Sequence, residues 1–177
     1  MASHRPLHTP RLTILPADIA RLEALLSSAE AFKLITGFMV ADRFCPFDGA
    51  LAESLRAMRR SSNHDRPWWT PRLLIFNSGA AVIGLIGFKG PPQEGAVEVG
   101  YSVAPAYQNR GFATEALCAL TGHAIRFCNV RTIRAHTKPE PTPSTRVLEK
   151  SGFQKTTEII DPTDGLVWRW ERDRNTL

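Results

Sequence analysis

The stretch QNRGFATEALCAL, residues 108–120, determines how the rest of the sequence is interpreted. It begins with two amides, an arginine and a glycine, and within a few residues it becomes a run of alanines and leucines at helical spacing. The residues before it, AVEVGYSVAPAY (96–107), are typical of a strand. The sequence therefore predicts a strand, a glycine-containing turn and a helix in direct succession.

This junction has the properties of an anion site. The first turn of a helix leaves backbone N–H groups without partners, and the helix dipole adds partial positive charge there. Gly111 allows a close approach of the backbone, and Ala113 is too small to block it. Thr114 adds a hydroxyl and Arg110 a positive charge, so the junction suits a pyrophosphate. The alternative, which a lone glycine favours, is an ordinary turn beside a solvated arginine. The motifs of nucleotide-triphosphate loops and of dinucleotide sites are absent.

Composition limits the class of protein. A chain of 177 residues with 43% hydrophobic residues suits one domain, residues 1–177, and no internal boundary is visible. The first ten residues, MASHRPLHTP, lack the apolar core of a signal peptide, and no apolar run reaches the roughly 18 residues of a membrane span. We therefore expect a cytoplasmic protein without a membrane partner.

Charge and cysteines narrow the expected partners. The net charge of +5 favours anionic partners, including phosphorylated cofactors. The basic residues are scattered, which makes nucleic acid an unlikely ligand on this pattern. Cys45, Cys118 and Cys128 are odd in number and lack metal-ligand spacing, so we expect buried thiols and no metal site.

Strands and helices alternate along the chain, which indicates an α/β protein with a mixed sheet. The long helix has a stripe of apolar residues at helical spacing: Ala113, Ala116, Leu117, Leu120, Ala124 and Phe127. The predicted strands are residues 10–16, 71–79, 80–90, 96–105, 130–137, 153–160 and 164–172, with a hairpin at 77–79. The predicted helices are residues 17–28, 49–62, 112–128 and 142–152.

Several stretches resemble one family. QNRGFA (108–113) resembles the Gln/Arg-x-x-Gly-x-Gly/Ala signature of the GNAT superfamily of N-acetyltransferases. VIGLIGF (82–88), the whole of 97–117 and PSTRVLEKSGF (143–153) resemble that family's third strand, its fourth strand with loop and helix, and a later helix. Residues 9–25 resemble the branch that acetylates the N-termini of ribosomal proteins. The resemblance implies a mostly antiparallel central sheet, splayed at its fourth and fifth strands, with flanking helices.

The resemblance implies acetyl-coenzyme A as cosubstrate. The family's loop holds the pyrophosphate, which assigns this role to seven consecutive residues: Gln108, Asn109, Arg110, Gly111, Phe112, Ala113 and Thr114. The backbone around Ser102 and Val103 would pair with the pantetheine arm like an added strand. The Val103 N–H matches the family's donor to the oxyanion.

Catalysis needs a base, because most amines are protonated at neutral pH: the pKa is about 8 for an α-amino group and about 10.4 for lysine. Glu98, opposite two valines on its strand, is the candidate base, directly or through water; the alternative is a structural ion pair. Ser144 matches a serine of the ribosomal-protein branch and is the candidate acid; the alternative is helix capping. Leu148 stands where many members carry a proton-donating tyrosine, and Pro141 replaces an asparagine that contacts the cofactor.

Three functions remain open. The first is acetylation of a protein N-terminal amine. The second is acetylation of a small-molecule amine such as an antibiotic or a polyamine. In the third, the chain binds coenzyme A without turnover. The protein would be a monomer or a homodimer. We expect His123 and His136 to have no metal role, and we expect His64 to lie in an exposed loop. Trp168 and Trp170 should pack together in the core.

Overall fold

The computed structural model describes residues 5–44, 49–162 and 164–174. Its centre is a sheet with the strand order β1-β2-β4-β5-β6-β7-β9-β8. Neighbours pair antiparallel except β6 with β7, and the two-residue β3 pairs parallel with β5. In chain order the strands are β1 (Leu7–His8), β2 (Leu12–Pro16), β3 (Met39–Val40), β4 (Arg72–Phe76), β5 (Ala81–Phe88), β6 (Ala96–Val103), β7 (Thr132–Thr137), β8 (Gln154–Asp161) and β9 (Gly165–Asp173).

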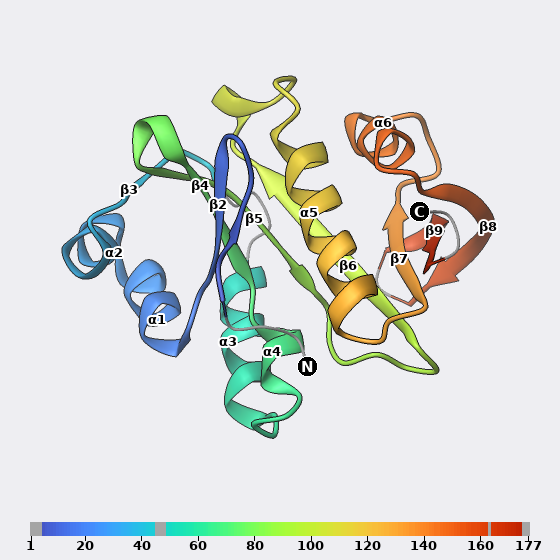
Figure 1. Cartoon of the computed structure of the whole chain (residues 1–177), viewed down its shortest axis with the longest axis horizontal. Helices are drawn as coiled ribbons and strands as arrows, with labels where there is room; N and C mark the ends of the chain where they lie inside the picture. Colours follow the sequence, from blue (N-terminus) through green and yellow to red (C-terminus); the bar gives the residue numbers. More distant parts are fainter. Residues whose placement is uncertain (1–4, 45–48, 163, 175–177) are drawn as a thin grey trace.

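Helices cover both faces of this sheet (Figure 1). They are α1 (Ile19–Ser27), α2 (Ala29–Thr36), α3 (Ala50–Arg60), α4 (Arg66–Trp69), α5 (Phe112–Phe127) and α6 (Pro143–Lys150). One core joins the sheet to α5 and α6, and includes Val97, Leu117 and Leu148. The other joins it to α1, α2 and α3, and includes Phe32 and Met58. The sheet is thus the middle layer of three.

The sheet opens between β6 and β7. These strands pair only from Ala96 to Glu98 on β6 and from Thr132 to Arg134 on β7. Beyond Glu98, β6 continues against β5 as far as Val103, while β7 continues against β9. The two strands therefore diverge, and α5 and α6 flank the opening (Figure 1). This confirms the predicted mixed sheet, splayed between the strands that carry residues 96–105 and 130–137.

The predicted strands and helices are all present, and the structure adds β1, α2, β3 and α4. One detail of the predicted stripe on α5 is wrong, because Phe127 is 67% exposed and Ile125 is buried instead. The predicted positions leave the buried face near the end of the helix, where Ile125 rather than Phe127 faces the core. No helix in the described part of the chain is long and apolar enough to span a membrane.

Two side-chain expectations also need correction. Cys118 is exposed on α5 and Cys128 is half-buried, so they are not both buried thiols; Cys45 lies outside the described residues. Trp170 is buried, but Trp168 is only partly buried beside it, with ring centroids 6.5 Å apart. Trp168 remains partly exposed because its Nε1 donates to the exposed Glu158 carboxylate at 2.8 Å, and the Lys155 ammonium lies over its ring, 3.7 Å from the centroid.

Candidate active site

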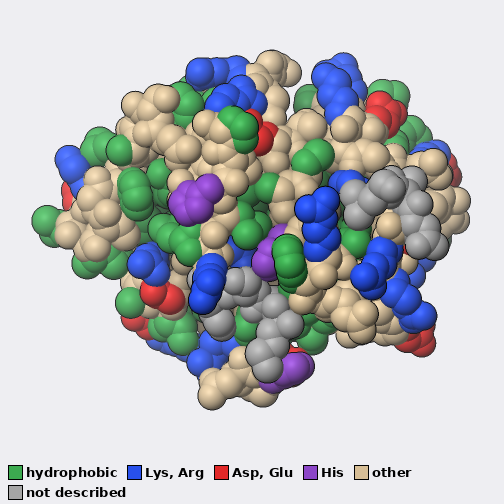
Figure 2. All heavy atoms as spheres, viewed as in Figure 1, with side chains coloured by type: hydrophobic (Ala, Val, Ile, Leu, Met, Phe, Trp, Pro, Cys, Tyr) green, Lys and Arg blue, Asp and Glu red, His purple; other side chains and the backbone are tan. Residues whose placement is uncertain are grey.

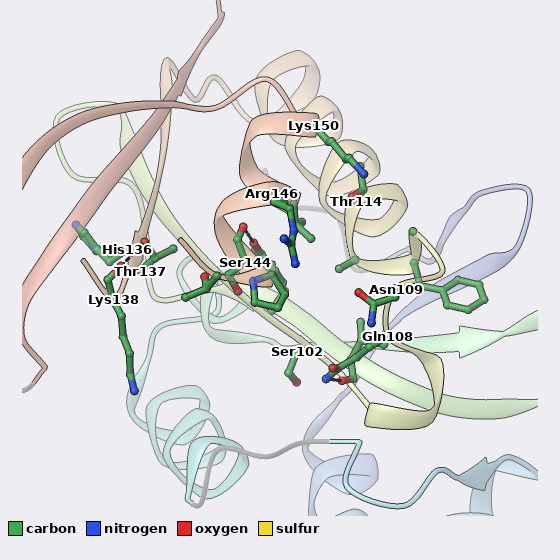
Figure 3. A pocket seen from close by; sticks show the side chains of 18 of the residues that line it. Ser102, Gln108, Asn109, Thr114, His136, Thr137, Lys138, Ser144, Arg146 and Lys150 are labelled. Carbon is green, nitrogen blue, oxygen red and sulfur yellow. Dashed lines mark hydrogen bonds between the residues drawn. The ribbon is translucent and has the colours of Figure 1, made fainter. Parts of the chain in front are cut away.

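A cavity of about 670 Å³ occupies the opening between β6 and β7 and continues to the N-terminus of α5 (Figure 3). It brings together most of the residues that the sequence assigned to the site: Ser102, Val103, Gln108, Asn109, Gly111, Phe112, Ala113, Thr114 and Ser144. Glu98 and Arg110 do not line it. The strand, the loop and the later helix therefore converge on one cavity.

The loop before α5 is shaped by left-handed backbone at two positions. Asn109 has φ of 59° and Gly111 has φ of 80°. Gly111 is the N-cap of α5, and no side chain caps the helix there. The amides of the first turn therefore remain available to a ligand. A glycine suits this position because a side chain in left-handed backbone costs roughly 1 kcal/mol.

Hydrogen bonds from the loop's own Gln108 and from the distant residues Thr9 and Arg11 hold this loop. The Gln108 Nε2 donates to the Val103 carbonyl oxygen at 2.9 Å, which ties the loop to the end of β6. Arg11 donates from Nη1 to the Arg110 carbonyl oxygen at 2.8 Å and from Nε to the Glu115 carboxylate at 2.7 Å. Burial alone would raise the pKa of Glu115, but hydrogen bonds from Thr9 and Arg11 outweigh it and lower that pKa. The loop is therefore braced before any ligand binds.

The positive charges of the cavity differ from those expected. Arg110 was expected beside the pyrophosphate but does not line the cavity. Its guanidinium lies over aromatic rings, 5.2 Å from the centroid of Phe112 and 5.6 Å from that of Tyr107. Arg146 and Lys150, one turn apart on α6, line the cavity in its place, and Figure 3 shows Arg146 pointing from α6 into it. Their spacing of four residues on one helix face was the signal in the sequence. On the face of the molecule seen in Figure 2, Lys and Arg side chains are scattered over the surface.

The edge of β6 is open beside the cavity. In an antiparallel pair, residues alternate between those that bond to the partner strand and those that face away from it. The Ala104 N–H donates to the Ile83 carbonyl oxygen of β5 at 2.7 Å. Tyr101 and Val103 therefore direct their N–H groups to the other side, where pairing with β7 has ended. An extended ligand could pair with this edge as a further strand.

Glu98 is the last residue of β6 that pairs with β7, and its carboxylate is held by two partners. Its Oε1 lies 2.5 Å from Lys89 Nζ and 3.1 Å from His136 Nδ1. Burial would raise the pKa of Glu98, but the hydrogen bonds from His136 and Lys89 prevail and lower it. His136 and Lys89 both line the cavity, and sequence reasoning assigned neither of them to the site.

Ser144 lies on the first turn of α6 without capping that helix. The cap is formed by Thr142 and Thr145, each side chain bonding to the other's backbone N–H. The Tyr101 hydroxyl donates to the Ser144 carbonyl oxygen at 3.1 Å. Burial raises the pKa of Tyr101 to about 12, a rise that the contact with Ser144 reduces. Leu148 is 1% exposed and belongs to the core.

Other conspicuous residues lie away from the cavity. His64 is exposed in the loop before α4, and Pro141 is exposed before α6. Trp68 is buried in the core, and Trp69 is half-buried. Within the described ranges, no group of three or more His, Cys, Asp or Glu side chains could hold a metal ion.

Comparisons with known proteins agree with this arrangement. Residues 11–154 match the family described as Acetyltransferase (GNAT) domain. An uncharacterized N-acetyltransferase, p20 of Bacillus licheniformis, is 34% identical over 105 residues, which are 59% of this chain and 54% of that protein. The chain spans about half the length of the curated relatives it matches.

Solved structures share the fold at low sequence identity. The ribosomal-protein-S5-alanine acetyltransferase of Vibrio fischeri superposes with a TM-score of 0.69 at 13% identity, over 97% of each chain. The aminoglycoside acetyltransferase AAC(6')-Ib in complex with coenzyme A superposes with a TM-score of 0.53 at 22% identity, over 60% of this chain and 67% of that one. At these identities the likeness concerns the fold alone.

Proposed function

Because the chain belongs to the GNAT acetyltransferase family, we propose that it transfers an acetyl group from acetyl-coenzyme A to a primary amine. One observation carries the proposal. The uncapped N-terminus of α5, with left-handed Gly111, opens into the same cavity as the unpaired edge of β6. An anion site beside an open strand edge suits a ligand with a pyrophosphate at one end and an extended amide-containing arm.

The residues present fit this cosubstrate. The amides from Gly111 onward would bind the pyrophosphate, and Arg146 and Lys150 would add positive charge. The open edge at Tyr101 and Val103 would hold the pantetheine arm. When bound, acetyl-coenzyme A supplies an activated acetyl group as a thioester.

The chain's own residues would then promote the transfer. The Val103 N–H would stabilise negative charge that develops on the carbonyl oxygen. Glu98, through its contact with the cavity residue His136, would form the basic end of the site. Ser144, whose helix is capped by other side chains, would donate to the departing sulfur.

For the acceptor we propose a protein N-terminal amine. The charges that line the cavity favour this over a polycation, because Lys89, Lys138, Arg146 and Lys150 face it and Asp164 is the carboxylate among the described lining residues. A polyamine or an aminoglycoside would meet repulsion there. A small-molecule amine of lower charge is the second candidate. The proposal further places the protein in the cytoplasm, as a monomer or a homodimer.

The proposal is tested by the release of free thiol from acetyl-coenzyme A. Purified protein is incubated with peptides that have free N-termini, with the same peptides acetylated, and with spermidine and an aminoglycoside. We expect release with free N-termini and none with the acetylated controls. Faster release with the polycations would reverse the proposed acceptor. Tight binding of acetyl-coenzyme A without release on any amine would favour a binding module, that is, a protein that binds coenzyme A without turnover. Pro141 and Leu148 keep this function open, because they stand where the family carries an asparagine and a tyrosine.

A further inference from the structure

We propose that His136, rather than Glu98, takes the proton from the acceptor amine, and that Glu98 orients the ring. The inference rests on the acetyl transfer proposed above and assigns its direct base. His136 is the member of the pair that lines the cavity. Figure 3 places it on β7, at the end of the cavity away from Asn109 and Thr114. That end is free for an acceptor when the loop holds the pyrophosphate.

The neighbours of His136 select one tautomer. The Glu98 carboxylate, 3.1 Å from Nδ1, can only accept a hydrogen bond when ionised. Arg169 Nε lies 3.4 Å from Nε2 and can only donate. When the ring is neutral, these two neighbours favour the tautomer with its proton on Nδ1 and a lone pair on Nε2. The contact with Arg169 is long, so it holds that lone pair weakly. A carboxylate that holds an imidazole in this way also stabilises the imidazolium that forms.

Glu98 is poorly suited to take the proton itself. Its Oε1 is shared between Lys89 Nζ and the ring of His136. These two hydrogen bonds overcome the effect of burial and lower its pKa, which makes it a weaker base. Imidazole is the side chain that most often serves as a base near neutral pH. The carboxylate therefore contributes best through the ring that it holds.

Among the charges around His136, the Glu98 carboxylate would stabilise a transient imidazolium and the Arg169 guanidinium would oppose it. Glu98 faces the ring from β6 with a negative charge. Lys89, directly after β5, also forms an ion pair with this carboxylate. Arg169 faces the ring from β9, Lys138 follows directly after the end of β7, and Asp164 lines the same cavity. In the proposed step His136 Nε2 accepts the proton that the amine nitrogen releases. The nitrogen forms its bond to the acetyl carbon, the carbon–sulfur bond breaks, and the sulfur leaves with the electron pair and is later protonated.

The kinetic test compares His136→Asn with His8→Asn, a matched change on exposed β1. We expect His136→Asn to lower kcat/KM about a hundred- to ten-thousandfold at pH 7 and to recover toward wild type as the pH rises and the amine loses its proton unaided. Acetyl-coenzyme A affinity and melting temperature should stay near wild type; if His136→Asn fails to fold, His136→Gln replaces it. A loss that is equal at every pH, or no loss, overturns the assignment.

A second readout does not depend on turnover. Nitrogen-15 NMR of the histidine rings, with His136→Asn used to assign the signal, reports which nitrogen carries the proton in the free protein. We expect the proton on Nδ1. A proton on Nε2 in an active wild-type protein would overturn the role of His136 and leave the proposed acetyl transfer standing. A wild-type protein that releases no thiol with any amine overturns the proposed function, and this role with it.

Discussion

The Glu98 carboxylate and the His136 imidazole meet where β6 and β7 stop pairing, with Oε1 and Nδ1 3.1 Å apart. In a parallel ladder, residues of one register row share a face of the sheet, and Glu98 is in register with Arg134. His136 lies two residues beyond Arg134, on the same face. The divergence of the strands thus leaves the pair at the border between paired backbone and the cavity.

The change Glu98→Gln should lower turnover most at neutral and lower pH, while acetyl-coenzyme A still binds. A glutamine can donate to Nδ1 and so move the ring proton to Nε2, where a lone pair is needed. The checks are a pH–rate profile and calorimetry. Glu171→Gln is the matched control, because Glu171 is ion-paired to Arg134 at 2.7 Å and does not line the cavity. A Glu98→Gln profile that coincides with wild type would leave Glu98 only its structural ion pair.

The change Gly111→Asp should abolish the binding of acetyl-coenzyme A. It places a carboxylate where the phosphates would bind, at a position with φ of 80°. Calorimetry measures the affinity. Gly37→Asp is the matched control, because Gly37 has φ of 77° and open space around it at the end of α2. The Gly37→Asp variant has the same backbone strain, so it should lose similar stability but keep its affinity for acetyl-coenzyme A. Unchanged affinity in folded Gly111→Asp would remove the loop from the site.

Local signals in the sequence predicted the elements that build the cavity. The glycine turn before α5 and the Thr142 cap of α6 are encoded within a few residues, so both were predicted. Helix α2 was missed because its apolar pattern is misleading: Leu34 is 86% exposed and Ile35 57%. Its real boundaries lie in the Ser28 cap and left-handed Gly37, which resemble ordinary loop residues in sequence.

The partners within the site depend on register and could not be predicted. Nothing in the sequence near Glu98 indicates that His136 will contact it, because that contact follows from which residues of β6 and β7 pair. The brace between Arg11 and Glu115 joins residues 104 positions apart. Arg110 was expected at the phosphates because it precedes Gly111, but left-handed Asn109 turns the chain there and the guanidinium lies over aromatic rings.

The change Gln108→Ala should weaken the binding of acetyl-coenzyme A without removing it. It deletes the hydrogen bond to the Val103 carbonyl oxygen, which holds the loop in its binding shape. One such bond contributes about 1 kcal/mol, so we expect about a fivefold loss of affinity. Gln93→Ala, at an exposed position before β6, is the control and should leave affinity unchanged. An affinity for Gln108→Ala equal to that of the control would show that the loop keeps its shape without this bond.

The change Glu115→Gln should destabilise the protein only at pH values where Glu115 is ionised. The pKa of Glu115 is lowered from its ordinary 4.5 in the folded protein. Its ionised form therefore stabilises the fold fully above the unfolded-state pKa, and this is lost as the pH falls through the folded-state pKa. The gap in Tm between wild type and variant should be largest above about pH 5 and close at lower pH. Glu149→Gln, at an exposed position of α6, should show no such gap. A gap independent of pH would mean that Glu115 acts by shape alone.

The change Ser144→Ala distinguishes an enzyme from a binding module. If Ser144 donates to the departing sulfur, the variant should turn over more slowly while its affinity for acetyl-coenzyme A stays nearly intact, because that negative charge exists only late in the reaction. Its Tm should barely change, since Thr142 and Thr145 cap α6. Thr142→Ala is the opposite control: losing the cap should cost about 1 kcal/mol of stability, with a smaller effect on rate. Turnover and Tm are measured together on both variants. A lower Tm with normal turnover in Ser144→Ala would assign the serine to the helix, and Tyr101, whose hydroxyl contacts its backbone, would become the next donor to test.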